Sequence, residues 1–237
     1  MQFLHPQTYK GAFPKTTRSL HDFPMIKNDQ FTIRRSDERG HANHGWLDTY
    51  HSFSFADYYD PAHMGFRSLR VINEDMISPG AGFPPHPHRD MEIFSYLLDG
   101  QLQHKDSMKN ERVLEPSQIQ LMSAGAGVTH SEFNPSATDP THMLQIWITP
   151  AKIGIEPRYT EWHPSAGTTT GKTLVISPDG REQSATIIQD AFVYRIKLAG
   201  EETVKHNLIH GRGVWLQIVK GGASIGRHQP KADDAIS

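Results

Sequence analysis

Residues 82–100 read GFPPHPHRDMEIFSYLLDG, and this stretch indicates the fold class. The run Met91–Leu98 is apolar and rich in residues that favour strands. Asp99-Gly100 follows it directly and is a strong signal for a β-hairpin. Helical periodicity is almost absent from the chain. Similar short strands, bounded by Gly, Pro, Asn and Asp, are predicted around residues 69–73, 119–121 and 143–148.

The second half of the chain repeats this pattern after a looser segment, 151–171, which contains Pro157, Pro164 and Gly167 and is predicted to be a linker. Strands are expected at 174–177, 192–198 and 214–219, with Phe192, Tyr194, Ile196 and Leu198 on one face of the second. Strands at such spacing without intervening helices favour an all-β sandwich or barrel. No glycine-rich phosphate loop follows a strand, so nucleotide chemistry is not expected.

The C-terminal residues Ala235-Ile236-Ser237 stop in the middle of an apolar pattern. The two halves look like weak repeats of one β-barrel, and a closed second barrel would need more strands. We therefore expect an incomplete second barrel, with Ile236 at the start of an unpaired strand. The alternative is that the N-terminal segment or a neighbouring chain completes it.

Composition excludes several classes of function. The 237 residues carry 24 Lys and Arg against 26 Asp and Glu, so no basic excess supports direct binding of nucleic acid. The absence of cysteine excludes disulfides, thiolate metal sites, iron–sulfur clusters and cysteine nucleophiles. No apolar run is long enough to span a membrane, and the first residues lack a secretory signal. A cytoplasmic protein is the expectation.

Residues 1–30 are predicted to form an N-terminal arm. Residues 1–35 hold six Lys or Arg against Asp22 and Asp29, a local charge of +4, which leaves −6 for the rest of the chain. A transit peptide is the alternative, but Pro6, Pro14 and Pro24 interrupt any amphipathic helix.

Two pairs of residues predict a metal site. His86 and His88 are two apart, as are His130 and Glu132, and residues i and i+2 of a strand project to the same face. Two neighbouring strands would then offer three imidazoles and one carboxylate. Such a donor set suits Fe(II), Mn, Ni or Co, and also admits Cu and Zn. Pro85 and Pro87 place the first pair on an edge strand. The alternative interpretation of His-Pro-His is a surface turn.

These motifs resemble those of a known family. GAGFPPHPHRDME (residues 80–92) resembles the first cupin motif and GAGVTHSEFN (residues 125–134) the second. The stretch 38–75, the segments HKDS and LQIWITP, and both motifs together are similar to bacterial pirin-like proteins. Lys109 and Ser117 stand at turn positions where many members carry Gly.

The resemblance to pirins implies a bicupin. We expect an N-terminal metal-binding cupin at 31–150, the linker at 151–171 and a truncated, metal-free C-terminal cupin at 172–237. It implies iron held by His86, His88, His130 and Glu132. It also implies quercetin 2,3-dioxygenase activity for bacterial members, with a flavonol and O2 as substrates. Eukaryotic members imply the alternative, a redox-sensing transcriptional cofactor with a protein partner.

Other residues are predicted to support this site or to lie apart from it. Glu132 is the candidate catalytic base, because a metal-bound hydroxyl loses its proton readily. Glu92 is expected to orient a histidine or gate the pocket, with metal ligation as the alternative. His206 and His210 are expected to be bystanders. Six aromatic residues could form a flavonol-stacking surface, although core and barrel-rim positions are the commoner use: Trp46, Tyr50, Phe53, Phe55, Tyr58 and Tyr59.

Overall fold

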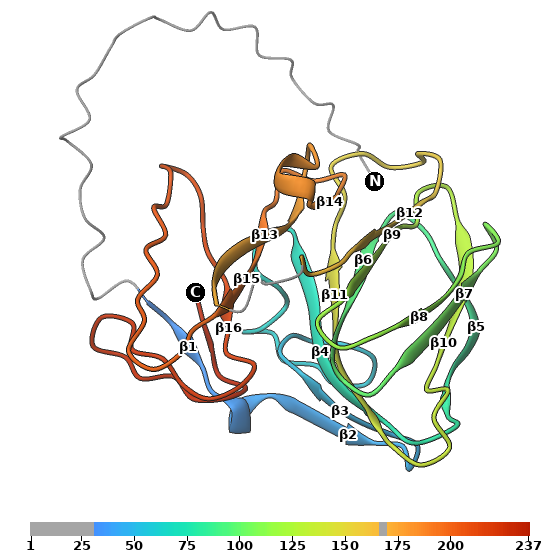
Figure 1. Ribbon diagram of the computed structural model, residues 1–237, viewed down its shortest axis with the longest axis horizontal. Coiled ribbons are helices and arrows are strands. Elements are labelled where there is room, and N and C mark those ends of the chain that lie inside the picture. The colour runs from blue at the N-terminus through green and yellow to red at the C-terminus, as the bar shows by residue number, and fades with distance from the viewer. Residues whose placement is uncertain (1–30, 166–169) are drawn as a thin grey trace, which may run out of the picture. The chain divides into compact units, whose positions relative to one another are not determined.

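The computed structural model describes residues 31–165 and 170–237, and the predicted arm at 1–30 lies outside them. In this part of the chain the ordered elements are strands and two short 3-10 turns, η1 (Ser36–Glu38) and η2 (Arg181–Gln183) (Figure 1). The first-half strands are β1 (Ile33–Arg34), β2 (Gly40–Asn43), β3 (Leu47–His51), β4 (Leu69–Ile77), β5 (Gly82–His88), β6 (Glu92–Asp99), β7 (Leu102–Asp106), β8 (Glu111–Leu114), β9 (Ile119–Ser123), β10 (Val128–Phe133) and β11 (Thr141–Ile148). They are followed by β12 (Arg158–Trp162), β13 (Gly171–Ser177), β14 (Ala185–Thr186), β15 (Val193–Lys197), β16 (Leu216–Gln217) and β17 (Ala235–Ile236). The predicted all-β class is confirmed.

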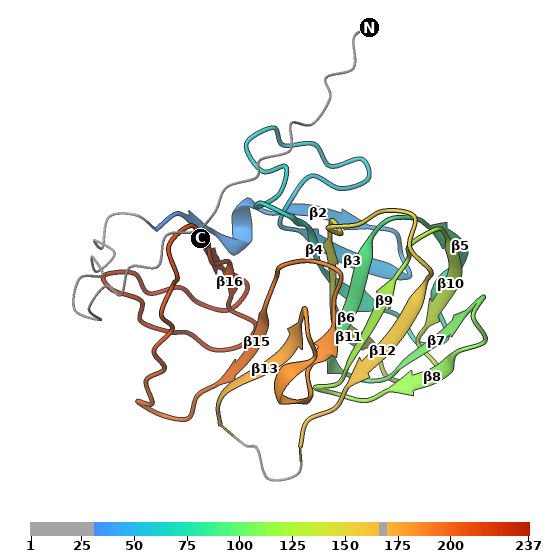
Figure 2. The same cartoon turned by 90° about the horizontal axis from the view of Figure 1, so that it is seen from above.

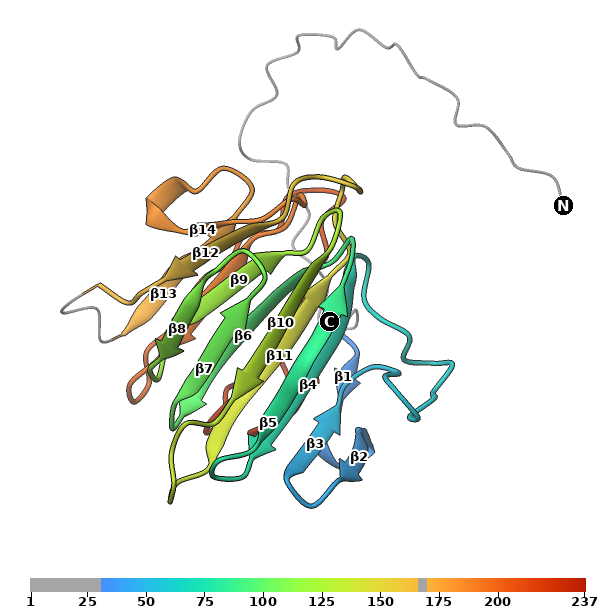
Figure 3. The same cartoon turned by 90° about the vertical axis from the view of Figure 1, so that its right-hand side faces the viewer.

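Two antiparallel sheets form the barrel that carries the candidate site. One has seven strands in the order β12-β9-β6-β11-β4-β3-β2, and the other has four in the order β5-β10-β7-β8. Figure 3 shows the second sheet lying across the first. An apolar cluster joins them, with Leu97 and Met143 from the large sheet and Leu102 and Leu114 from the small one. The barrel interior is therefore the space between these two sheets.

The central strands β6, β9 and β11 are buried on both faces, which explains the nearly continuous apolar run at 91–98. Phe94, Leu121 and Ile148 point away from the barrel and pack against Val175 and Ile176 of the C-terminal half. The alternate residues of the same strands point into the barrel. These inward-facing side chains are apolar at some levels of the barrel and polar at others.

The polar layer of the barrel lies between two apolar ones. Along β6, Leu97 and Ile93 belong to separate apolar clusters, and the inward residue between them is Ser95. Along β11, Gln145 similarly lies between Met143 and Trp147. Strand pairing places the polar residues in one row across the sheet: His51, Asn73, Gln145, Ser95, Gln120 and Glu161. A row of hydrogen-bonding side chains thus crosses the barrel at one level.

The strands of the C-terminal half lie in two three-stranded sheets, β14-β13-β15 and β1-β17-β16, and the second of these includes β1 from the first half. Figure 2 shows β13 and β15 of the first sheet and β16 of the second. The expectation of an unpaired strand at Ile236 is wrong. β17 lies between β1 and β16, and Ile236 is 2 % exposed. Ile33 and Arg34, just after the predicted arm, supply one of its neighbours. β17 is therefore the central strand of its sheet and is paired on both sides.

Two further expectations need correction. The segment 151–171 was expected to be a linker, but β12 lies within it and pairs with β9 at the edge of the large sheet. The strand expected at 214–219 is shorter, because only Leu216 and Gln217 pair with β17. Within the described ranges, no helix is long and apolar enough to cross a membrane. The cytoplasmic location stays a prediction.

Candidate metal centre

Strands β5 and β10 lie side by side and bring three histidines together. β5 is the edge strand of its sheet, as its prolines require, and His130 of β10 pairs directly with His86. The ring centroids of His86, His88 and His130 are 4.5 to 4.9 Å apart. One nitrogen of each ring lies within 4.8 Å of the others. The predicted convergence of the two pairs is therefore seen for the histidines.

A hydrogen bond orients the His86 ring for metal binding, and the His130 ring holds a buried nitrogen without a partner among the described residues. His86 Nδ1 lies 2.7 Å from the carbonyl oxygen of Pro84, which accepts only, so Nδ1 carries the proton and Nε2 keeps its lone pair. His130 is 2 % exposed, and its Nε2 receives no hydrogen bond from any described residue. A buried, unpartnered imidazole nitrogen is costly unless it binds something. The site thus fits a metal ion with imidazole ligands.

The electrostatics of the cluster also suit a cation. Burial and the neighbouring His86 and His104 lower the pKa of His130 to about 3. Burial, His130 and His86 lower the pKa of His88 to about 4. Both rings are consequently neutral near pH 7, and a neutral ring is the form that donates a lone pair to a metal.

Glu132 joins the cluster from one side. Its carboxylate lies within 4.8 Å of ring nitrogens of His130 and His104, in a second group that shares His130 with the first. A register shift in the β5–β10 pairing explains the offset, because His130 faces His86 whereas Glu132 faces Phe83. Glu132 is therefore out of step with His86 and His88 on β5, whereas its pairing with β7 is regular.

Three neutral donors from the polar row hold the Glu132 carboxylate. Ser95 Oγ and Gln120 Nε2 donate to Oε1 over 2.8 and 2.6 Å, and Gln145 Nε2 donates to Oε2 over 2.9 Å. Glu132 is fully buried, so these bonds replace water and fix the direction of the carboxylate. Sequence reasoning missed all three donors. Their signal is a polar residue at the inward position of an otherwise apolar strand.

His104 and Asp106 were also missed. They lie on β7 opposite Glu132 and His130, and the two side chains are fully buried. His104 Nδ1 is 3.5 Å from His130 Nδ1, and His104 Nε2 is 3.1 Å from the Asp106 carboxylate. The spacing of two residues between His104 and Asp106 could have indicated this pair, as it did for the other two.

Glu92 has a different role from the one expected. Its carboxylate accepts hydrogen bonds from Ser123 Oγ over 2.7 Å and from the backbone N–H of Ile188 over 3.2 Å. Glu92 points away from the barrel interior, like Phe94, and neither histidine group of the described residues includes it. Burial raises its pKa. Glu92 therefore ties the large sheet to the C-terminal half.

The predicted aromatic residues and His206 lie in different surroundings. Phe53 is buried against Trp215, whereas Tyr59 is 73 % exposed. Phe55 lies edge-on to Trp147, which in turn lies edge-on to His88 with 4.9 Å between centroids. His206, in the C-terminal half, contacts Lys172 and Tyr194. The histidine–carboxylate groups found in the described ranges both belong to the first half.

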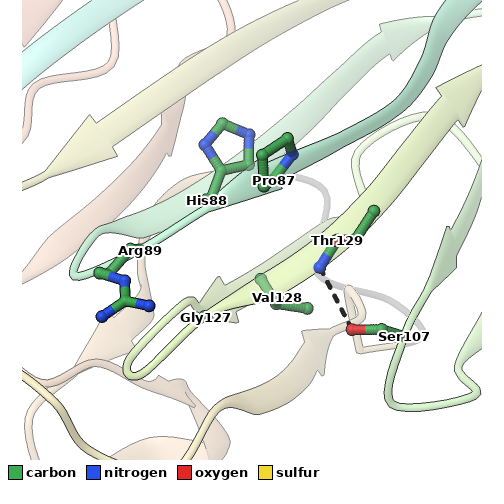
Figure 4. Close-up of a pocket in the computed structure, with 7 residues that line it drawn as sticks. All are labelled: Pro87, His88, Arg89, Ser107, Gly127, Val128 and Thr129. Atoms are coloured by element: carbon green, nitrogen blue, oxygen red, sulfur yellow. Dashed lines mark hydrogen bonds between the residues drawn. The ribbon is translucent and has the colours of Figure 1, made fainter.

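A pocket of about 400 Å³ adjoins the cluster at His88. Figure 4 shows Pro87 and His88 on one strand, Arg89 just after it, and Val128 and Thr129 on the next strand, with the Thr129 N–H donating to Ser107 Oγ. Gly127, at the same end of β10, has a φ of +139°, which favours glycine, and its open side faces Arg89. Histidines at the rim of a two-sheet barrel, beside a pocket, define a metal site of the cupin type.

Comparison with known proteins agrees with this geometry. Residues 32–148 match the family model described as Pirin, and residues 174–237 match that of the quercetinase C-terminal cupin domain. The chain belongs to the pirin family, with N-terminal and C-terminal cupin domains. It is 48 % identical over 205 residues to a quercetin 2,3-dioxygenase of Escherichia coli K12, covering 86 % of this chain and 88 % of the relative. A pirin-like protein of Caulobacter vibrioides is 39 % identical, over 80 % and 82 %.

A solved structure shows the same fold. The bacterial pirin YhhW from Escherichia coli in complex with nickel(II) is 47 % identical, covers 87 % of this chain and 88 % of its own, and superposes with a TM-score of 0.84. A divalent ion therefore binds to a pirin whose sequence and fold are similar to those of this chain.

Proposed function

We propose that this protein is a metal-dependent dioxygenase that opens the heterocycle of a flavonol such as quercetin with O2. The ion, iron(II) in our proposal, is held by His86, His88, His130 and Glu132. The observation that carries the proposal is the buried, unpartnered Nε2 of His130 beside two further imidazoles. The name of the E. coli relative supports the reaction class.

A divalent ion bound at these residues supplies a Lewis acid that makes a coordinated hydroxyl group more acidic. Glu132 accepts the proton of the flavonol hydroxyl in our proposal. Its Oε2 receives one hydrogen bond from the described residues and Oε1 receives two, so Oε2 keeps more capacity for a proton. Gln145, Ser95 and Gln120 hold the carboxylate in one direction, which limits the motion that proton transfer would otherwise require.

The wall beside His88 suits a flat aromatic substrate. Trp147 presents aromatic surface next to the His88 ring, and Phe55 lies edge-on to Trp147. The Trp147 indole N–H donates to Gln145 over 3.2 Å, which fixes its orientation. Arg89 follows β5 directly, lines the pocket and has no ion-pair partner among the described residues. A guanidinium there would attract the anionic form of a phenolic substrate.

Metal analysis of the purified protein, followed by an oxygen-electrode assay with quercetin, tests the proposal. We expect stoichiometric divalent metal and O2 uptake that depends on the flavonol. Glu132→Gln should retain some metal, since an amide oxygen still coordinates, and should lose most turnover. A metal-loaded protein that consumes no O2 with flavonols would contradict the enzymatic proposal, and equal rates for Glu132→Gln and wild type would remove the proposed base.

A further inference from the structure

Asp106 is an anchored carboxylate behind the metal site. Its Oδ1 accepts the backbone N–H groups of Met108 and Asn110 over 2.9 and 3.0 Å, and the Asn110 side-chain amide donates to Oδ2 over 2.8 Å. Oδ2 also lies 3.1 Å from His104 Nε2. Three N–H groups donate to this carboxylate, so Asp106 is an acceptor fixed by the turn between β7 and β8.

The Asp106 carboxylate determines where the protons lie in the hydrogen-bonded series Asp106–His104–His130. Because Asp106 only accepts, His104 Nε2 must carry the proton. When the ring carries only this proton, its Nδ1 is an acceptor, and His130 Nδ1 lies 3.5 Å from it as the donor. With its proton on Nδ1, His130 keeps the lone pair on Nε2, the buried nitrogen without a described partner.

The opposite arrangement is unfavourable at two points. A proton on His130 Nε2 would be a buried donor with no acceptor, and two lone pairs would face each other between the Nδ1 atoms. Tyr159 packs on His104 with 5.1 Å between ring centroids and restricts its rotation. Tyr159 thus holds the His104 ring in the orientation that lets it contact both Asp106 and His130.

We propose that Asp106 and His104 are positioning residues that hold His130 in the tautomer with its proton on Nδ1, so that Nε2 is presented to the metal. The inference rests on the proposed metal site and extends it by two residues outside the four ligands. A second layer of this kind typically contributes 10- to 100-fold to metal affinity.

The tautomers can be read directly in the metal-free protein. Long-range proton–nitrogen correlation spectra of 15N-histidine-labelled protein should show the proton of His130 on Nδ1 and that of His104 on Nε2. In Asp106→Asn the new amide N–H points at His104 Nε2, so both tautomers should invert. Asp48→Asn is the matched control, because Asp48 pairs with His41 at the surface over 2.6 Å and away from the cluster; it should leave both tautomers unchanged.

Metal affinity provides the second readout. Competition between the protein and a chelator for Ni²⁺ should show Asp106→Asn binding about 10- to 100-fold more weakly than wild type and Asp48→Asn. Because Asp106 also caps a turn, a second pair of variants avoids that site. His104→Leu removes the acceptor and should weaken Ni²⁺ binding similarly, whereas His104→Asn keeps a side-chain oxygen near the position of Nδ1 and should recover most of the affinity.

The outcomes separate this inference from the proposed function. Wild-type protein that binds no Ni²⁺ would contradict the metal site itself. Wild type that binds Ni²⁺ with His130 protonated on Nε2 before loading, or His104→Leu with unchanged affinity, would overturn the positioning role alone. A third combination would also overturn it. If His104→Asn lost as much Ni²⁺ binding as His104→Leu while His86→Ala kept full binding, His104 would be a ligand and not a positioning residue.

Discussion

Gln120 donates a 2.6 Å hydrogen bond to Glu132, although its neighbours Ile119 and Leu121 pack on the opposite face of the same strand. The strand alternates between two buried surfaces, and the polar position faces the metal site. Gln120 is 3 % exposed, so its amide and the carboxylate depend on each other for hydrogen bonding.

Gln120→Met should therefore destabilise the metal-free protein. The substitution keeps the side-chain length but leaves Oε1 of a buried carboxylate with one donor fewer, which costs about 1–3 kcal/mol. Gln103→Met is the matched control, because the Gln103 amide reaches Glu111 only at 3.5 Å and at the surface. Urea denaturation of the three proteins measures the difference. Equal midpoints for Gln120→Met and the control would show that the hydrogen bond contributes little.

Removing one histidine of the cluster should abolish stoichiometric metal binding. We expect His86→Ala to purify folded but without a full complement of metal, because two imidazoles and one carboxylate hold a divalent ion less well than four ligands. His206→Ala, in the C-terminal half beside Lys172, should retain the metal of the wild type. Elemental analysis checks both, with near-UV circular dichroism to confirm folding. Full metal in His86→Ala would remove it from the ligand set.

Asp75 should make the metal-free protein less stable as pH rises. Burial is the main cause that raises its pKa to about 7, and Glu132 and Glu74 add to it, while Thr49, which donates over 2.5 Å, and His142 act against it. Between about pH 4 and pH 7 the folded state retains a proton that the unfolded state has lost. This contribution is thus present at low pH and is lost as pH rises to 7.

Asp75→Asn removes the titrating group and keeps an oxygen for Thr49. From pH 4.5 to pH 8 the variant should gain a few kcal/mol of unfolding free energy relative to wild type, on the order of 1.4 kcal/mol per pKa unit. The comparison is between the two proteins at each pH, because protonation of His88 and His130 in the unfolded state changes both equally. A constant difference across this range would contradict the raised pKa.

Two turns contain non-glycine residues in the left-handed region of φ, a conformation that favours glycine. Lys109 has a φ of +73° and Ser117 a φ of +71°. A non-glycine residue there costs about 1–2 kcal/mol. Lys109→Gly and Ser117→Gly should each raise the melting temperature, partly offset by the greater entropy of glycine in the unfolded chain. Lys105→Gly, within β7, should lower it; calorimetry distinguishes the three.

Much of the barrel and the outline of its site could be predicted from local patterns. The Asp-Gly turn after 91–98, the same-face spacing of His86 with His88 and of His130 with Glu132, and the prolines of the edge strand all act within a few residues. Alternation of side chains is a property of the extended backbone itself. For this reason the strands and the convergence of the histidines followed from the sequence.

Only the tertiary structure decided which surface each alternating face meets. Glu92 points to the C-terminal half and Gln120 into the barrel because their strands lie between two cores, and a single strand cannot indicate which neighbour covers which side. The pairing of Ile236 with Ile33 likewise joins residues about 200 positions apart. His104 and Asp106 became part of the site through the pairing of β7 with β10. Such contacts depend on strand order and register, which the whole chain sets through burial rather than any local pattern.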